Sequence, residues 1–60
     1  MGRIQLLGTT GTAHTDLNPE GAVLIEGELW NARSIDGTTI AAQQDVEVVR
    51  VEGLLLLVRR

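Results

Sequence analysis

The sequence predicts an all-β fold, a small barrel of five strands, from three observations. Apolar segments of strand length are separated by turn residues, namely one Asn-Pro-Glu-Gly run and three pairs of an acidic residue and a glycine. Only the segment Thr38–Asp45 has any helical character, and it is long enough for a single turn. An open sheet would leave apolar faces in water, so closure into a barrel is expected.

The expected turns come from glycine and proline. In the Asn-Pro-Glu-Gly run, Pro19 suits the second position of a β-turn because its φ is fixed, and Gly21 suits the fourth position. The remaining turns are expected to be tight hairpin turns in which the glycine takes a positive φ. They are Glu26-Gly27, Asp36-Gly37 and Glu52-Gly53. The glycines and the proline are therefore interpreted as the corners of the barrel.

The first three strands are predicted from side-chain alternation and length. In Thr12–Leu17, the side chains of Ala13, Thr15 and Leu17 alternate with those of His14 and Asp16. Ala22–Ile25 is short and nearly all apolar. Glu28–Ile35 has tryptophan and alanine on one face, and asparagine and arginine on the other.

The last two strands form a predicted hairpin. In Asp45–Glu52 the phase of the valines shifts between Val48 and Val49, which predicts a bulge or a sharp bend. Leu54–Arg60 completes the hairpin. The segment before it, Thr38–Asp45, is predicted to be a connection rather than a helix.

Two large apolar side chains are expected inside the barrel. Trp30 is the only aromatic residue of the chain. Tryptophan often anchors interfaces, but as the largest apolar side chain it is assigned here to the core, where it would bury about 200 Å². Ile40 is expected to plug one end of the barrel.

Composition excludes several classes of function. The chain has 60 residues, no cysteine and one histidine, which excludes disulfides, thiolate zinc sites and clusters of imidazole ligands. It has no lysine, which excludes biotinyl or lipoyl carriage and Schiff-base chemistry. The net charge is −3, whereas nucleic-acid binding draws on a basic field and on aromatic platforms. The longest apolar run, Leu54–Val58, is much shorter than a membrane span, so the chain taken alone is expected to be soluble.

A longer pattern runs through almost the whole chain. Residues 6–21 have the form Leu-x-Gly-x-x-Gly-x-Ala-x-Thr-x-Leu-x-Pro-x-Gly, and residues 46–58 the form Val-x-Val-Val-x-Val-x-Gly-x-x-Leu-x-Val. Between them stands the run Glu-Gly-Glu-Leu-Trp-Asn-Ala. This pattern resembles the C-terminal soluble domain of the NfeD family. The residues that carry the resemblance are, in order, Gly8, Gly11, Leu17, Pro19, Gly21, Gly27 and Gly53.

The resemblance implies a five-stranded OB-fold barrel, in agreement with the turns and strands above. It implies that residues 1–11 are a linker from an upstream membrane helix and that residues 12–60 are the barrel domain. The parent protein would lie in the cell membrane, with this domain on the cytoplasmic face and not inserted in the bilayer. Such parents are thought to work with stomatin-, flotillin- or prohibitin-like membrane scaffold proteins. Longer members carry a ClpP-like serine protease domain, none of which lies in this chain.

One position departs from the family pattern. Where the family has a glycine before the fourth strand, in the form Ile-x-x-Gly-x-x-Val, this chain has Gln43. The backbone at Gln43 is therefore not expected to need a conformation reserved for glycine.

No catalytic, cofactor or metal site is predicted. His14 and Asp16 share a strand face and would suggest a triad with Ser34, but the strand assignment brings neither near Ser34, so both are interpreted as solvated. The run Gly8–Gly11 lacks the lysine and the spacing of a phosphate-binding loop and is interpreted as a flexible lead-in to the barrel. A calcium site needs oxygens that converge from a tight loop, whereas the acids are spread over strand ends and turns. The acids considered are Glu26, Glu28, Asp45, Glu47 and Glu52.

The run Leu54–Val58 is apolar on both faces of a strand. Leu55 and Leu57 share the face opposite to that of Leu56 and Val58, and both faces cannot lie inside a small barrel. Either N-terminal apolar residues cover the first pair, or that pair forms an exposed patch of the kind that marks interaction surfaces. The N-terminal candidates are Ile4, Leu6 and Leu7. Leu55 and Leu57 are therefore the predicted partner-binding residues.

The sequence predicts a non-catalytic protein–protein interaction module that engages a stomatin-, flotillin- or prohibitin-like partner and needs no cofactor. One alternative is a regulatory or substrate-presenting module of a membrane-bound ClpP-class serine protease. A second, a nucleic-acid-binding OB domain, is disfavoured by the missing basic and aromatic residues. The Leu55 and Leu57 face would also serve as the contact of a homo-oligomer.

Overall fold

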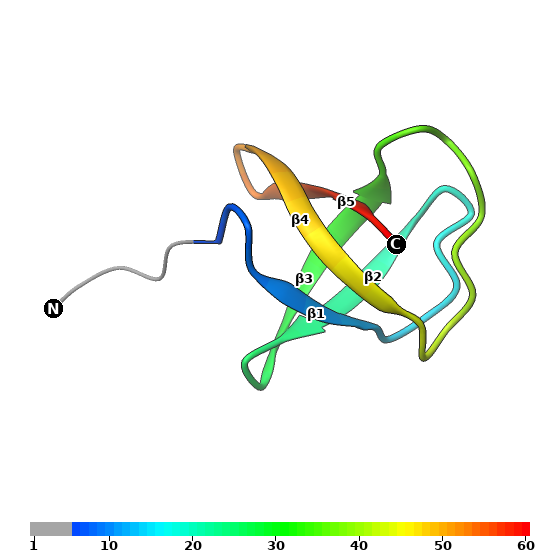
Figure 1. The fold of residues 1–60 in the computed structure, drawn as a ribbon, viewed down its shortest axis with the longest axis horizontal. Coiled ribbons are helices and arrows are strands. Elements are labelled where there is room, and N and C mark those ends of the chain that lie inside the picture. Colours follow the sequence, from blue (N-terminus) through cyan, green and yellow to red (C-terminus); the bar gives the residue numbers. More distant parts are fainter. Residues whose placement is uncertain (1–5) are drawn as a thin grey trace, which may run out of the picture.

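The computed structural model describes residues 6–60 of the chain, and within them it contains five strands and no helix. The strands are β1 (Thr10–Ala13), β2 (Glu20–Ile25), β3 (Glu28–Ser34), β4 (Asp45–Glu52) and β5 (Leu55–Arg59). They close into a barrel in the order β1-β2-β3-β5-β4 (Figure 1). The predicted fold class, a five-stranded OB-fold-like barrel, is confirmed.

The hairpin β2–β3 is paired over the whole of β2, from Glu20 opposite Arg33 to Ile25 opposite Glu28. Its turn is the predicted Glu26-Gly27 pair. Glu26 has φ +51° and Gly27 has φ +79°, as a type I′ turn requires. Glycine adopts this conformation easily, whereas residues with a side chain rarely do.

Two further pairings close the barrel. β1 runs antiparallel to β4, and β3 runs parallel to β5. β4 and β5 form the second hairpin, and its register shifts between Val48 and Arg50. The predicted bulge in β4 is therefore confirmed.

The core fills the inside of the barrel. Leu17 and Ile40 close one end, because their backbone N–H and C=O groups exchange hydrogen bonds of 2.8 and 3.0 Å. They belong to the two connections that lie at the end opposite the hairpin turns (Figure 1). Trp30 is half-buried and, like Leu6, packs against the core. The core residues are Ala13, Leu17, Val23, Ile25, Ala32, Ile40, Val46, Val48, Leu56 and Val58. The predictions that Ile40 plugs an end of the barrel and that Trp30 packs with the core agree with this arrangement.

The first strand differs from its prediction. It spans Thr10–Ala13 rather than Thr12–Leu17, because the chain bends at His14 and Thr15. Ala22 of β2 holds the bend. Its carbonyl oxygen accepts the N–H groups of His14 and Thr15 at 2.8 and 3.3 Å, and its own N–H donates to Thr15 Oγ1 at 3.1 Å.

Three turns also differ from their predictions. Gly21 lies inside β2 and not in a turn. Asp36 and Gly37 begin a connection and not a hairpin, because β3 pairs with β5 rather than with β4. The turn between β4 and β5 is made by Gly53 and Leu54, one position later than predicted, and Gly53 has φ +60°.

Two strand glycines are required by close packing. A Cβ on Gly21 would lie 2.5 Å from the carbonyl oxygen of Asp16 and 2.5 Å from Thr15 Oγ1. A Cβ on Gly11 would lie 2.5 Å from the carbonyl oxygen of Leu24. Gly11 is thus a packed strand residue and not part of a flexible lead-in.

Gln43 adopts a glycine-like conformation, with φ +77°. Its N–H donates to the carbonyl oxygen of Ala13 at 2.7 Å, and the Ala13 N–H donates to the carbonyl oxygen of Gln44 at 2.8 Å. These bonds fix the chain where it enters β4. The expectation that this position needs no glycine conformation is therefore wrong.

Candidate functional site

The two predicted partner-binding leucines lie on the outer face of β5, but only one of them is accessible. Leu55 is half-buried, whereas Leu57 is only 8% exposed. Leu57 lies between Arg33 of β3 and Arg50 of β4 in the sheet register. Long arginine side chains cover apolar neighbours with their aliphatic stems. Of the two alternatives for this pair, exposure therefore does not hold for Leu57. Ile4, one of the residues considered as cover, lies outside the described residues.

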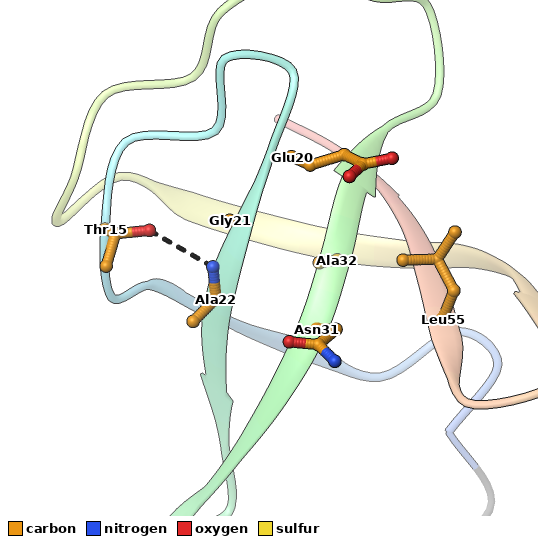
Figure 2. A pocket seen from close by; sticks show the side chains of 7 residues that line it. All are labelled: Thr15, Glu20, Gly21, Ala22, Asn31, Ala32 and Leu55. Atoms are coloured by element: carbon orange, nitrogen blue, oxygen red, sulfur yellow. Dashed lines mark hydrogen bonds between the residues drawn. The ribbon is translucent and has the colours of Figure 1, made fainter.

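Leu55 borders a groove on the outside of the barrel. The groove has a volume of about 500 Å³ and crosses β2 and β3 (Figure 2). It is shallowest in side chain at Ala22, whose single methyl group lies opposite Asn31 in the outward row of β2 and β3. The residues that line it are Thr15, Glu20, Gly21, Ala22, Asn31, Ala32 and Leu55.

One wall of the groove is the bend after β1. Thr15 Oγ1 accepts the Ala22 N–H at 3.1 Å, the bond drawn in Figure 2, and donates to the carbonyl oxygen of Asp16 at 3.1 Å. The bend can lie this close to β2 only because Gly21 has no Cβ. The same glycine therefore sets the path of the chain that forms this wall of the groove.

The rest of the groove offers contacts for binding. Arg33 and Glu20 form an ion pair of 3.0 Å at one side. Asn31 is exposed, and its carboxamide makes no hydrogen bond to residues 6–60. Leu55 supplies an apolar surface at the other side (Figure 2). These groups can hold a ligand by packing and hydrogen bonds, and none of them is an activated nucleophile or base.

An exposed apolar pair adjoins this groove and was missed from the sequence. Leu24 of β2 and Leu29 of β3 are opposite each other, and they are 39% and 54% exposed. The signal that could have revealed them is the alternation of β2, in which Val23 and Ile25 point inward. The run is nearly all apolar, so its phase is hard to assign before the pairing is known.

The residues considered for a catalytic triad serve separate structural roles. Ser34 is buried, and its hydroxyl donates to Asp36 Oδ1 at 2.9 Å. Asp16 Oδ1 accepts the N–H of Ala42 at 2.8 Å, so this carboxylate holds a connection rather than being merely solvated. His14 is exposed on the bend after β1.

Asp36 is the acid whose titration is perturbed. The hydroxyl and N–H of Thr38 and the hydroxyl of Ser34 donate to its carboxylate and hold its pKa below the ordinary value of 3.8. Asp36 and Thr38 also line a second hollow of about 310 Å³ beside Arg59 and Arg60. The Asp36 carboxylate already accepts hydrogen bonds from these three donors. This hollow is therefore a weaker candidate for a binding site than the groove.

Within residues 6–60, no three histidine, aspartate or glutamate side chains are grouped as a metal site requires. No helix in that part of the chain is long and apolar enough to cross a bilayer.

The sequence matches one protein family and one curated relative. Residues 3–60 match the family described as the NfeD-like C-terminal, partner-binding domain. A membrane-bound protease of Pyrococcus horikoshii is 42% identical over 59 residues. The match covers 98% of this chain and 13% of that protease, so the chain spans a small part of its relative's length.

Two solved structures have the same fold. The C-terminal domain of a stomatin operon partner protein from Pyrococcus horikoshii superposes with a TM-score of 0.90 at 42% identity, covering 100% of this chain and 94% of that one. The soluble domain of a Corynebacterium glutamicum membrane protein, implicated in regulation of membrane protease activity, gives 0.87 at 30% identity. That match covers 92% of this chain and 90% of the other.

Proposed function

The chain belongs to the NfeD family, as its C-terminal, partner-binding domain, and from this premise we propose that it is a non-catalytic module that docks a membrane scaffold protein of the stomatin, flotillin or prohibitin class. The name of the Pyrococcus horikoshii structure, a stomatin operon partner, supports this choice of partner. The groups that line the groove also support binding rather than catalysis.

The observation that carries the proposal is the groove over β2, β3 and β5. It places the half-buried Leu55, one of the two predicted partner-binding residues, beside the exposed Leu24 and Leu29. Adjoining apolar side chains on a surface favour protein–protein contact. Leu57, two residues along β5 from Leu55, is only 8% exposed and offers little surface to a partner.

On this proposal the parent protein lies in the cell membrane and holds the domain on the cytoplasmic face, without inserting it into the bilayer. The names of the relatives, a membrane-bound protease and a membrane protein, support the membrane location. The residues before β1 would then link the barrel to an upstream membrane helix, a shorter linker than residues 1–11, because Thr10 and Gly11 already lie in β1. Because Leu6 packs against the core and β1 begins at Thr10, this linker would continue directly into the barrel.

A second candidate function is regulation of, or substrate presentation to, a membrane protease of the ClpP class. Two observations favour it: one relative is named as a membrane-bound protease, and another is named for the regulation of membrane protease activity. The same groove would then bind the protease or its substrate. Binding of nucleic acid is disfavoured, because the chain has no lysine and Arg33, Arg50 and Arg59 are each paired with a glutamate.

Backbone amide NMR of the labelled chain tests the proposal. Addition of a soluble segment of a stomatin-like protein is expected to shift amides of β2, β3 and β5 around the groove, and a short single-stranded DNA is expected to shift none. Leu55→Ser should weaken binding about tenfold, as loss of an interface anchor does. Leu54→Ser is the matched control, because Leu54 is 80% exposed at the next position and lies outside the groove.

Two results would contradict the proposal. One is the absence of shifts with the scaffold protein while the barrel stays folded. The other is an equal loss of binding in Leu55→Ser and Leu54→Ser, which would move the contact to the β4–β5 turn.

A further inference from the structure

We propose that the groove and the pair Leu24 and Leu29 together bind an extended peptide segment of the partner, apolar at alternate positions and basic where it passes over the β2–β3 turn. This inference rests on the proposed function for the location of the docking site. It goes further by assigning the chemistry and the direction of the segment that is bound.

The apolar part of the surface is continuous. Leu24 and Leu29 are opposite each other on β2 and β3, and the next outward pair along these strands is Ala22 and Asn31. Two residues of a strand span about 7 Å, so the leucine pair lies next to the floor of the groove. Asn31 is in turn opposite Leu55 on β5. A ligand can therefore contact all three leucines without crossing a charged side chain.

Asn31 lies at the centre of this surface and favours a peptide backbone as the ligand. It is flanked by Ala22 on β2 and by Leu55 on β5. A carboxamide donates and accepts hydrogen bonds, and a peptide group offers both complementary atoms. An extended peptide also repeats its side chains on one face every 7 Å or so, which matches the spacing of outward residues along β3.

The charge at the turn end of the surface is uncompensated. Glu26 is exposed next to Leu24, and Glu28 is exposed at the start of β3, opposite Ile25 and in the phase that points away from Leu29. Neither carboxylate forms an ion pair within residues 6–60. At the other end of the surface, Glu20 is neutralised by Arg33 at 3.0 Å. Electrostatic complementarity therefore favours lysine or arginine at the turn end and fixes the direction of the bound segment.

Other occupants fit this surface less well. A second copy of the chain also carries a net charge of −3, so like charges oppose its approach to this acidic end of the surface. A bilayer with anionic headgroups would be repelled by Glu26 and Glu28 for the same reason. A basic, apolar peptide meets neither obstacle.

Three short synthetic peptides test the assignment by amide NMR. The first alternates leucine and threonine and ends in two lysines, the second ends in two glutamates instead, and the third has serine in place of leucine. The lysine peptide is expected to shift the amides of Leu24, Leu29, Asn31 and Leu55. The glutamate peptide should bind roughly fivefold more weakly, as expected for a few rim charges, and the serine peptide should show no measurable binding. Equal binding of the lysine and glutamate peptides, or of the leucine and serine peptides, would overturn the inference.

A pair of double variants tests the turn directly. Glu26→Gln with Glu28→Gln should lower the affinity for the lysine peptide roughly fivefold and remove its advantage over the glutamate peptide. Asp45→Asn with Glu47→Gln changes the net charge equally but on β4, and it should leave the affinity unchanged. An equal loss in both would show that net charge, not the turn, selects the ligand, and would overturn the inference.

The peptides are not taken from any scaffold protein, so the two proposals can fail separately. If the lysine peptide binds as expected and the stomatin-like segment does not, the proposed partner is wrong and the chemistry of the surface stands. If the stomatin-like segment binds at the groove and the peptides show no preference, the inference alone is overturned.

Discussion

The two hairpins of the barrel have very different outer surfaces. On β4–β5, Arg59 pairs with Glu47 at 3.0 Å, Arg50 pairs with Glu52 at 3.1 Å, and Leu57 is buried. On β2–β3, two leucines and a carboxamide are exposed, and both carboxylates at the turn are without an ion pair in the described part of the chain. These two arginines of β4–β5 are paired within the chain, whereas the two leucines, the carboxamide and the turn carboxylates of β2–β3 are left for a partner.

This difference separates residues that hold the fold from residues that are free to bind. Exposed ion pairs such as Arg59 with Glu47 each contribute only about 0–1 kcal/mol to stability. Their larger effect is that these charged groups on the β4–β5 side of the barrel already have partners within the chain. Leu54 is an exposed apolar residue at the β4–β5 turn, and scattered residues of this kind are ordinary on protein surfaces.

The largest expected effect comes from Gly21→Ala, which disturbs the packing of the β2–β3 hairpin, where the groove lies. The new methyl group would meet the carbonyl oxygen of Asp16 at 2.5 Å, and relief requires a shift of backbone. We expect a loss of about 3 kcal/mol in the free energy of unfolding, measured by urea denaturation with the fluorescence of Trp30.

Gly37→Ala is the matched control for that variant. Gly37 has φ +79° but nothing within 4 Å of an added Cβ, so only the backbone conformation opposes the change. A loss of about 1 kcal/mol is expected. If both variants lose the same free energy of unfolding, the close contact at Gly21 does not determine the stability of the fold.

The next largest effect is expected on the affinity for the partner and not on the stability of the fold. Leu29→Ser should weaken the complex with the stomatin-like segment about tenfold, because an apolar anchor of the surface is lost. Leu7→Ser is its control, because Leu7 is 55% exposed and Leu29 is 54% exposed. Calorimetric titration measures both, and equal losses would remove the distinction between the docking surface and other exposed leucines.

A smaller effect is expected at Gln43, where the chain enters the first strand of the other hairpin. Gln43→Gly should raise the free energy of unfolding by about 1 kcal/mol, because φ +77° is strained for a residue with a Cβ. Affinity for the partner should not change. A lower stability in the variant would mean that the glutamine side chain makes up for its backbone strain.

The smallest effect is a dependence of stability on acid pH through Asp36 at the end of β3. The pKa of Asp36 is lowered in the folded protein by donors from Thr38 and Ser34, so the unfolded chain takes up this proton first as the pH falls. Its contribution is complete above the ordinary pKa of 3.8 and is lost as the pH falls through the folded value. The stability difference between the protein and Asp36→Asn should therefore shrink between neutral pH and about pH 2. A difference that stays constant with pH would contradict this role.

Local features were predictable from the sequence, and contacts between distant segments were not. The positive φ of Gly27 and the bulge after Val48 follow from local patterns and were predicted. The need for glycine at Gly21 arises from Asp16, which comes close only after the bend forms. The burial of Leu57 depends in the same way on Arg33 and Arg50, which the strand order places on either side of it.

The candidate site was predictable only in part, because it too depends on which strands pair. The sequence selected Leu55 because both faces of its strand are apolar. It gave little sign of Leu24, since a short apolar run has no visible phase until its partner strand is known. The alternation of Glu28–Ile35 could have placed Leu29 on the face of Asn31. Periodicity marks which segments form strands, and the pairing decides which of their side chains remain accessible.

The most direct test of the account is the set of methyl contacts in the complex with the stomatin-like segment. Intermolecular NOEs measured by NMR on leucine methyl groups report which side chains touch the partner. The account predicts NOEs from the partner to Leu24, Leu29 and Leu55, and none to Leu54 at the turn of the other hairpin. NOEs to Leu54 without any to Leu29 would contradict it and move the docking surface to β4–β5.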